Sequence, residues 1–129
     1  MKINCIEISI NDDDLGCQVC FSEKKSLGEE AADMSVQEII DSTGEYLLIQ
    51  KSYPEYEFES EYIYFETHDG EFSGELVDYE MILSKERFEL NLKNEKIEVL
   101  INPSKKEYSK LKKILPILTN KSGKLIIND

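Results

Sequence analysis

The feature that most constrains the fold is a run of alternating apolar and polar residues in the second half of the chain. The alternation covers 77–83, 88–92 and 97–101, and the short polar segments SKER and KNEK separate the three stretches. A strand with one buried and one wet face has this period of two, and short polar connections join antiparallel neighbours. The pattern therefore predicts an antiparallel meander over 76–101.

A helix is expected directly after the meander. Ser104 and Glu107 have the spacing of a capping box, which marks a helix start. Apolar residues then recur every three or four positions, as on one face of a helix: Tyr108, Leu111, Ile114, Leu115 and Leu118. Pro116 should end or kink this helix within a turn. We therefore expect an α+β domain with a mostly antiparallel sheet and one amphipathic helix, about 104–115, packed on one face.

The first half of the chain predicts further strands. Apolar residues recur over 3–10 and 17–21, and the Asn- and Asp-rich segment 11–16 between them favours a hairpin turn. The apolar run 46–50 predicts a central strand buried on both faces. Residues 62–67 predict another strand, followed by a turn at Asp69-Gly70.

Two shorter patterns complete the expected topology. Ser35 and Glu38 have capping-box spacing before two isoleucines, which predicts a helix of about two turns. Residues 125–128 favour a last edge strand. No repeat and no linker interrupts the sequence, so we expect a single domain over 1–129.

Charge is divided unevenly along the chain. Residues 1–80 carry 21 acidic and 4 basic side chains, residues 81–129 carry 6 and 11, and the net charge is −12. We expect no nucleic-acid partner, because no basic stripe is dense enough to displace counterions from phosphates. We expect no membrane partner, because an anionic surface would repel the chain. The balance favours a basic protein partner, although acidity alone also keeps domains soluble.

Residue types that carry catalysis or bind metals are poorly arranged. Cys17 and Cys20 have the spacing of a zinc or redox pair, but residues three apart on a strand point to opposite faces. The aspartates 12–14 lack the alternate spacing of a calcium loop. His68, the one histidine, adjoins a turn, and abundant carboxylates single out no acid–base pair. We therefore expect no cofactor, no metal ligand and no catalytic residue. An odd cysteine count and the lack of an apolar leader predict a cytoplasmic location.

Aromatic rings and carboxylates are interleaved in the segment 53–66, YPEYEFESEYIYFE. In one interpretation the rings, Tyr64 among them, face the core while the glutamates face water. In the other, rings and acids form a binding surface, because tyrosines are common anchors of protein interfaces. The candidate partner-binding residues are Glu55, Tyr56, Glu57, Glu59, Glu61, Tyr62, Asp69 and Glu71.

Four segments follow one another in a definite order: YLLIQKS at 46–52, the tyrosine-rich strand ending at Glu66, the meander segment 73–92, and 97–115. This order, over about residues 44–118, resembles the immunity protein 10 family of bacterial polymorphic toxin systems. Such proteins are encoded beside a toxin and bind it in the producing cell. The resemblance implies a non-enzymatic cytoplasmic inhibitor that neutralises a cognate toxin domain, and the acidic composition suits a toxin with a basic surface.

Two other functions stay open. An adaptor or subunit module would join a larger assembly through an exposed sheet edge, for which residues 125–129 are suited. A small hydrolase would need a deep pocket with two carboxylates of unlike pKa.

Overall fold

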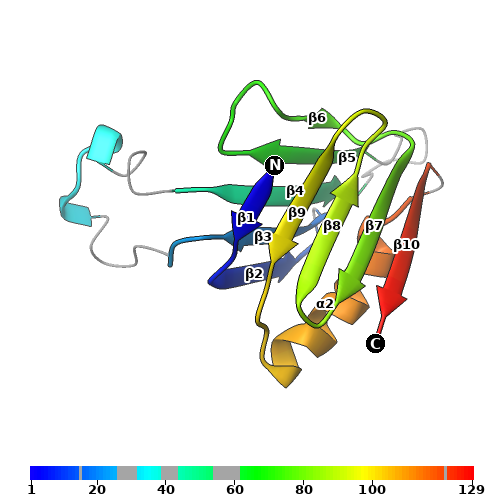
Figure 1. The fold of residues 1–129 in the computed structure, drawn as a ribbon. Helices are drawn as coiled ribbons and strands as arrows, with labels where there is room; N and C mark the ends of the chain where they lie inside the picture. Colours follow the sequence, from blue (N-terminus) through cyan, green and yellow to red (C-terminus); the bar gives the residue numbers. More distant parts are fainter. Residues whose placement is uncertain (15, 26–31, 39–43, 54–61, 121) are drawn as a thin grey trace.

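Two five-stranded sheets face each other across one apolar core in the computed structural model (Figure 1). The structure describes residues 1–14, 16–25, 32–38, 44–53, 62–120 and 122–129. In spatial order, sheet A consists of β1 (Lys2–Asn4), β9 (Lys96–Leu100), β8 (Arg87–Asn91), β7 (Tyr79–Ser84) and β10 (Gly123–Asn128). Sheet B consists of β2 (Glu7–Asp12), β3 (Gly16–Ser22), β4 (Tyr46–Ser52), β5 (Tyr62–Thr67) and β6 (Gly74–Glu75).

The predicted meander is confirmed as the centre of sheet A. Strands β7, β8 and β9 pair antiparallel, and every strand of sheet B is also antiparallel to its neighbour. The two edge strands of sheet A are parallel to theirs: β1 pairs with β9 and β10 pairs with β7. The expected edge strand 125–128 is thus present, and it begins two residues earlier at Gly123. A Cβ atom at Gly123 would collide with the Tyr79 ring, so glycine allows β10 to approach β7 there.

Inward side chains of the two sheets interlock in a single core. Phe21 of β3 and Phe88 of β8 stack with ring centroids 4.7 Å apart, and neither ring is accessible to solvent. Burying one such side chain stabilises a fold by about 1.5–3 kcal/mol. The stack therefore joins the middle of sheet B directly to the middle of sheet A.

Helix α2 (Lys105–Leu118) lies alongside both sheets and contacts β2, β3 and β4 of sheet B and β10 of sheet A (Figure 1). The predicted capping box is present: Glu107 N donates to Ser104 Oγ at 3.1 Å, and Ser104 N donates to Glu107 Oε1 at 2.9 Å. All five apolar residues predicted to form its stripe are buried. The helix ends two residues beyond Pro116, within the expected turn. The α+β prediction, with its C-terminal helix, is thereby confirmed.

The last turn of α2 is held by a lysine from sheet B. Lys51 is 7 % exposed and points inward from β4, where its Nζ donates to the Ile117 carbonyl oxygen at 2.8 Å. The last carbonyls of a helix have no partner within the helix, and cations near this end also interact favourably with the helix dipole. The described last turn contains no basic residue of its own, so Lys51 satisfies the helix end from another element.

The chain crosses between the sheets at two bends that the sequence pattern does not indicate. The single strand expected over 3–10 is divided at Cys5 and Ile6, where the chain leaves sheet A and enters sheet B. The second bend, 76–78, returns the chain from β6 to β7 and includes Asp78 at φ 52°. Aspartate tolerates this left-handed conformation better than most residues. Strands that switch sheets at such corners are typical of two-layer β structures whose strands cross.

Two smaller predictions have mixed outcomes. Strand β4 is central in sheet B, as expected, but it is not buried on both faces. Leu47, Ile49 and Lys51 point inward, whereas the alternate residues are half-buried or, at Ser52, exposed. Near Ser35, a helix begins at residues 36–38, and Glu38 N donates to Ser35 Oγ at 3.2 Å. The rest of that predicted helix lies outside the described residues.

Candidate partner-binding face

The outer faces of the two sheets point away from the core. They differ in charge because they come from differently charged parts of the sequence. Sheet B is built wholly from residues 7–75, whereas sheet A takes four of its five strands from residues 79–128. The acidic first part of the chain therefore supplies one face and the more basic second part supplies most of the other.

The outer face of sheet B carries acids and tyrosines but no basic residue at the positions the structure describes. The strand register and the inward burial of Val19, Ile49 and Phe65 fix which residues point outward. These outward residues are Glu7, Ser9, Asn11, Gly16, Gln18, Cys20, Ser22, Tyr46, Leu48, Gln50, Ser52, Tyr64, Glu66 and Glu75. At the described positions, the outward residues of this face thus include carboxylates but no lysine or arginine.

At the centre of the sheet B face, two tyrosines hold one carboxylate. Tyr46 donates its hydroxyl to Glu66 Oε2 at 2.7 Å, and Tyr64 donates its hydroxyl to Glu66 Oε1 at 2.6 Å. We call these three residues the tyrosine clasp. All three side chains are half-buried, so the cluster is ordered by hydrogen bonds but still in reach of solvent.

The register of two strands builds the clasp. Tyr64 and Glu66 are two residues apart on β5 and so share a face, while Tyr46 lies on the neighbouring strand β4. The Tyr46 backbone N–H donates to His68 Nδ1 at 3.3 Å, and the two rings meet edge-on. Leu48 lies directly opposite Glu66 in the ladder, which places an apolar side chain beside the carboxylate.

The clasp shifts the acid–base behaviour of its members. Hydrogen bonds from Tyr64 and then Tyr46 lower the pKa of Glu66, because they favour the charged carboxylate. Burial, followed by the hydrogen bond to Glu66, raises the pKa of Tyr46 to about 12. At neutral pH the Glu66 carboxylate is therefore charged, and the Tyr46 phenol that donates to it is neutral.

A polar depression of about 390 Å³ lies on sheet B near the β2–β3 hairpin. Three amide side chains, Asn11, Gln18 and Gln50, form one row across the strands, and the same row continues to Tyr64 and Glu75. The hairpin rim of the depression carries two further carboxylates, one of which, Asp12, accepts a hydrogen bond from Tyr53 at 2.8 Å. Hydrogen-bonding groups thus extend from the hairpin to the clasp.

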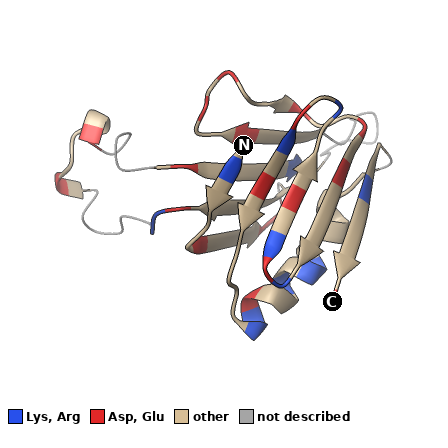
Figure 2. Ribbon diagram, viewed as in Figure 1, with Lys and Arg blue, Asp and Glu red and all other residues tan. Residues whose placement is uncertain are grey.

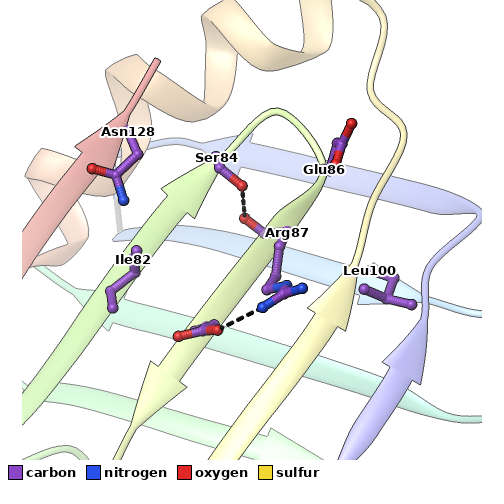
Figure 3. A pocket seen from close by; sticks show the side chains of 7 residues that line it. Ile82, Ser84, Glu86, Arg87, Leu100 and Asn128 are labelled. Carbon is purple, nitrogen blue, oxygen red and sulfur yellow. Dashed lines mark hydrogen bonds and ion pairs between the residues drawn. The ribbon is translucent and has the colours of Figure 1, made fainter.

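The outer face of sheet A has a depression of similar size, about 370 Å³ (Figure 3). Unlike the face of sheet B, it carries both acidic and basic side chains. Its outward residues include four bases, Lys2, Arg87, Lys96 and Lys124, and three acids, Glu80, Glu89 and Glu98. Figure 2 shows these charges side by side on the strands.

Ion pairs within β8 and between β8 and β9 organise the charges of sheet A. The Arg87 guanidinium lies 3.2 Å from Glu98 and 3.4 Å from Glu89, and Lys96 lies 3.2 Å from the same Glu89 oxygen. Such exposed pairs each contribute little to stability. Their consequence here is that acids and bases neutralise one another within the face.

The residues predicted from the sequence to bind a partner are only partly located. Glu55, Tyr56, Glu57, Glu59 and Glu61 lie outside the described residues, and of Tyr62 only the backbone, at the start of β5, is described. Asp69 and Glu71 are exposed in the turn between β5 and β6, where Glu71 N donates to Asp69 Oδ1 at 3.1 Å. This turn follows directly after β5, which carries Tyr64 and Glu66 of the clasp.

The interpretation that places Tyr64 in the core is wrong. Ile63 and Phe65 are the buried residues of β5, so Tyr64 and Glu66 point outward between them. The sequence analysis also missed Tyr46 as a member of the site. The apolar pair Ile63 and Phe65 could have shown that Tyr64 and Glu66 face outward, since alternate residues of a strand share a face. No local signal places Tyr46 beside them, because it lies on the neighbouring strand.

The two cysteines with the spacing of a zinc or redox pair do not share a face of the sheet. Cys17 points inward and is buried, whereas Cys20 points outward, so the two thiols lie on opposite faces as expected. Burial raises the pKa of the Cys20 thiol to about 11.

Within the described ranges, no three His, Cys, Asp or Glu side chains are grouped to hold a metal ion. In the same part of the chain, no helix has the length and apolar character needed to cross a membrane.

Searches of protein-family models, curated proteins and solved structures gave no match to this chain. A functional proposal must therefore rest on the chemistry of the two outer faces. At the described outward positions, the sheet B face combines tyrosines and glutamates with no lysine or arginine, whereas the sheet A face mixes acids and bases.

Proposed function

We propose that this chain is a non-enzymatic immunity-type protein that captures a basic protein domain on the outer face of sheet B and thereby neutralises a toxin. The observation that carries the proposal is the composition of that face, which combines three outward glutamates with Tyr46 and Tyr64 and has no described Lys or Arg among them. Tyrosines are enriched at interface hot spots, because they combine a large apolar ring with a polar tip.

The physics of inhibition agrees with such a surface. A cell that makes a toxic enzyme needs fast capture, and complementary charge raises association rates to about 10⁸–10⁹ M⁻¹s⁻¹ at low salt. A nuclease toxin domain is a suitable partner, because its own site must attract phosphate and is therefore basic. The resemblance to the immunity protein 10 family points to the same role, with the cytoplasm of the producing cell as the place of encounter.

Copurification from the native host, followed by identification of the bound protein, would supply the partner for a direct test. The double variant Glu71→Lys with Glu75→Lys reverses two exposed charges at the β5–β6 end of sheet B. The matched control, Glu86→Lys with Asp129→Lys, changes net charge equally at two exposed positions beside sheet A. We expect the first variant to slow association at least about tenfold at low salt and to flatten its salt dependence.

The control should change the association rate much less. If both double variants slow association equally, only net charge matters and the face of sheet B is not the binding surface. If neither has an effect, the partner binds elsewhere.

A second candidate function is an adaptor that joins an assembly through the edge of sheet A. Strand β10 is the last strand of that sheet, and its Ile126 is 40 % exposed. An edge strand of six residues offers backbone groups for pairing with another chain. The variant Ile126→Lys separates the two functions, because it should abolish assembly through this edge and leave capture by sheet B unchanged.

A further inference from the structure

Glu66 has hydrogen-bonding capacity beyond its two tyrosine partners. An ionised carboxylate has about four acceptor positions, two on each oxygen. Tyr46 occupies one position on Oε2 and Tyr64 occupies one on Oε1. Among the described residues, no basic side chain forms an ion pair with Glu66. One acceptor position per oxygen therefore has no donor among the described residues, and the half-buried carboxylate is in part accessible to solvent.

Two equivalent positions on the two oxygens of one carboxylate match a forked donor. The guanidinium of arginine presents parallel N–H groups that bind both oxygens of a carboxylate, whereas the ammonium of lysine is a point charge. The tyrosine hydroxyls also fix the carboxylate in position, so less rotational freedom is lost when a fork binds.

The surroundings of Glu66 suit the rest of an arginine side chain. Guanidinium groups stack on aromatic rings, and the rings of Tyr46 and Tyr64 belong to the same half-buried cluster as the carboxylate. Leu48 lies opposite Glu66 and Cys20 lies opposite Leu48, which gives a weakly polar strip across the sheet. The methylene stem of arginine packs well on such a surface.

We propose that the tyrosine clasp is a seat for a single arginine side chain of the partner, bound through both oxygens of Glu66 and flanked by Tyr46 and Tyr64. This inference rests on the proposed function, because it names the chemical group that the sheet B face recognises. The alternative is that the clasp only stabilises the surface of the sheet and contacts no ligand.

The probe is N-acetyl-arginine amide, titrated into the ¹⁵N-labelled full chain and followed by amide chemical shifts. We expect saturable shifts at Tyr46, Leu48, Tyr64 and Glu66 with a dissociation constant in the millimolar range. The citrulline analogue, which has the same shape and no charge, should produce none. The lysine analogue should bind at least about threefold more weakly, because it makes no bidentate contact.

The decisive variant is Glu66→Gln, which removes the charge and keeps the size. Its matched control is Glu98→Gln, the same change at an outward and half-buried position of sheet A. The arginine shifts should disappear in Glu66→Gln and persist in Glu98→Gln. Equal shifts in both variants, or shifts spread over all acidic residues, would overturn the inference. If Glu66→Gln does not fold, Tyr46→Phe serves instead and should weaken arginine binding several-fold.

The same variants distinguish this inference from the proposed function. Glu66→Gln should weaken binding of the copurified partner at least about tenfold, and Glu98→Gln should not. If the partner responds to reversal of Glu71 and Glu75 but not to Glu66→Gln, the face is correct and the arginine seat is wrong. If arginine amide binds the clasp but no variant on the sheet B face weakens binding of the partner, the arginine site is confirmed and the proposed function is wrong.

Discussion

The two outer faces of this protein have the same secondary structure, depressions of similar size and opposite ways of holding their carboxylates. On sheet A, Glu89 and Glu98 are held by Arg87 and Lys96. On sheet B, Glu66 is held by the hydroxyl groups of two tyrosines. A salt bridge fixes an acid and cancels its charge, whereas a phenol fixes an acid and leaves its charge intact.

This difference teaches how a small acidic domain directs its electric field. Total charge is a poor guide, because it does not show that the acids of sheet A are paired with bases on the same face. The field of sheet B remains, and it originates from side chains whose positions neutral hydrogen bonds define. A surface of this kind attracts a cation and is already ordered when the cation arrives.

The largest expected effect comes from breaking the core that holds both faces. Phe88→Ala removes one ring of the stack between the sheets and should lower the free energy of unfolding by about 3–5 kcal/mol. Chemical denaturation followed by circular dichroism measures this change. Ile126→Ala, at an exposed position of sheet A, is the control and should cost less than about 0.5 kcal/mol. A loss below about 1 kcal/mol for Phe88→Ala would mean that the sheets are not joined through this stack.

A smaller effect, specific to sheet B, concerns pH. The clasp lowers the pKa of Glu66 in the folded state, so its contribution to stability is present above the unfolded pKa. That contribution is lost as the pH falls through the folded pKa, because the protonated acid no longer accepts both phenols. Wild type should therefore be more stable than Glu66→Gln at pH 7, and the difference should shrink below about pH 4.

Urea unfolding of both proteins at several pH values between 3 and 7 would measure this difference. Its control is the same series with Tyr64→Phe added to both proteins, which should reduce the difference at pH 7. A difference that stays constant down to pH 3 would show that the clasp does not depend on the charge of Glu66.

The smallest effect is expected on sheet A. Arg87 is 50 % exposed, so Arg87→Met should change the free energy of unfolding by less than about 1 kcal/mol, and by less still at high salt. The same variant frees Glu89 and Glu98 from their arginine and should make sheet A attract a basic peptide that it otherwise ignores. Unchanged binding of a lysine-rich peptide to the variant would argue that pairing is not what distinguishes the two faces.

Much of the fold could be predicted from the sequence, because it is encoded locally. The three meander strands follow from a period of two, and helix α2 follows from Ser104, Glu107 and an apolar stripe. The division into two sheets could not be predicted in this way. Residues 3–10 have the apolar content of one strand, and the bend at Cys5 and Ile6 becomes visible only when each half has found a different neighbour.

The candidate site was less accessible to sequence reasoning than the fold. The acidic and aromatic character of 53–66 indicates a binding surface, but the clasp requires Tyr46 to lie beside Glu66, 20 residues further along the chain. That proximity depends on the register between β4 and β5, which composition does not encode. The phase of β5 also matters, since a shift by one residue would bury Tyr64 and expose Phe65.

The lysine that holds the end of α2 makes the docking of the helix measurable. The amine of Lys51 is shielded between β4 and Ile117, whereas Lys105, in the first turn of the same helix, is exposed. Acylating reagents modify amines only when they reach them, so Lys51 would be labelled only when the helix lifts away from the sheets. The ratio of labelling rates at the two lysines therefore reports, by mass spectrometry, how often the domain opens on that side.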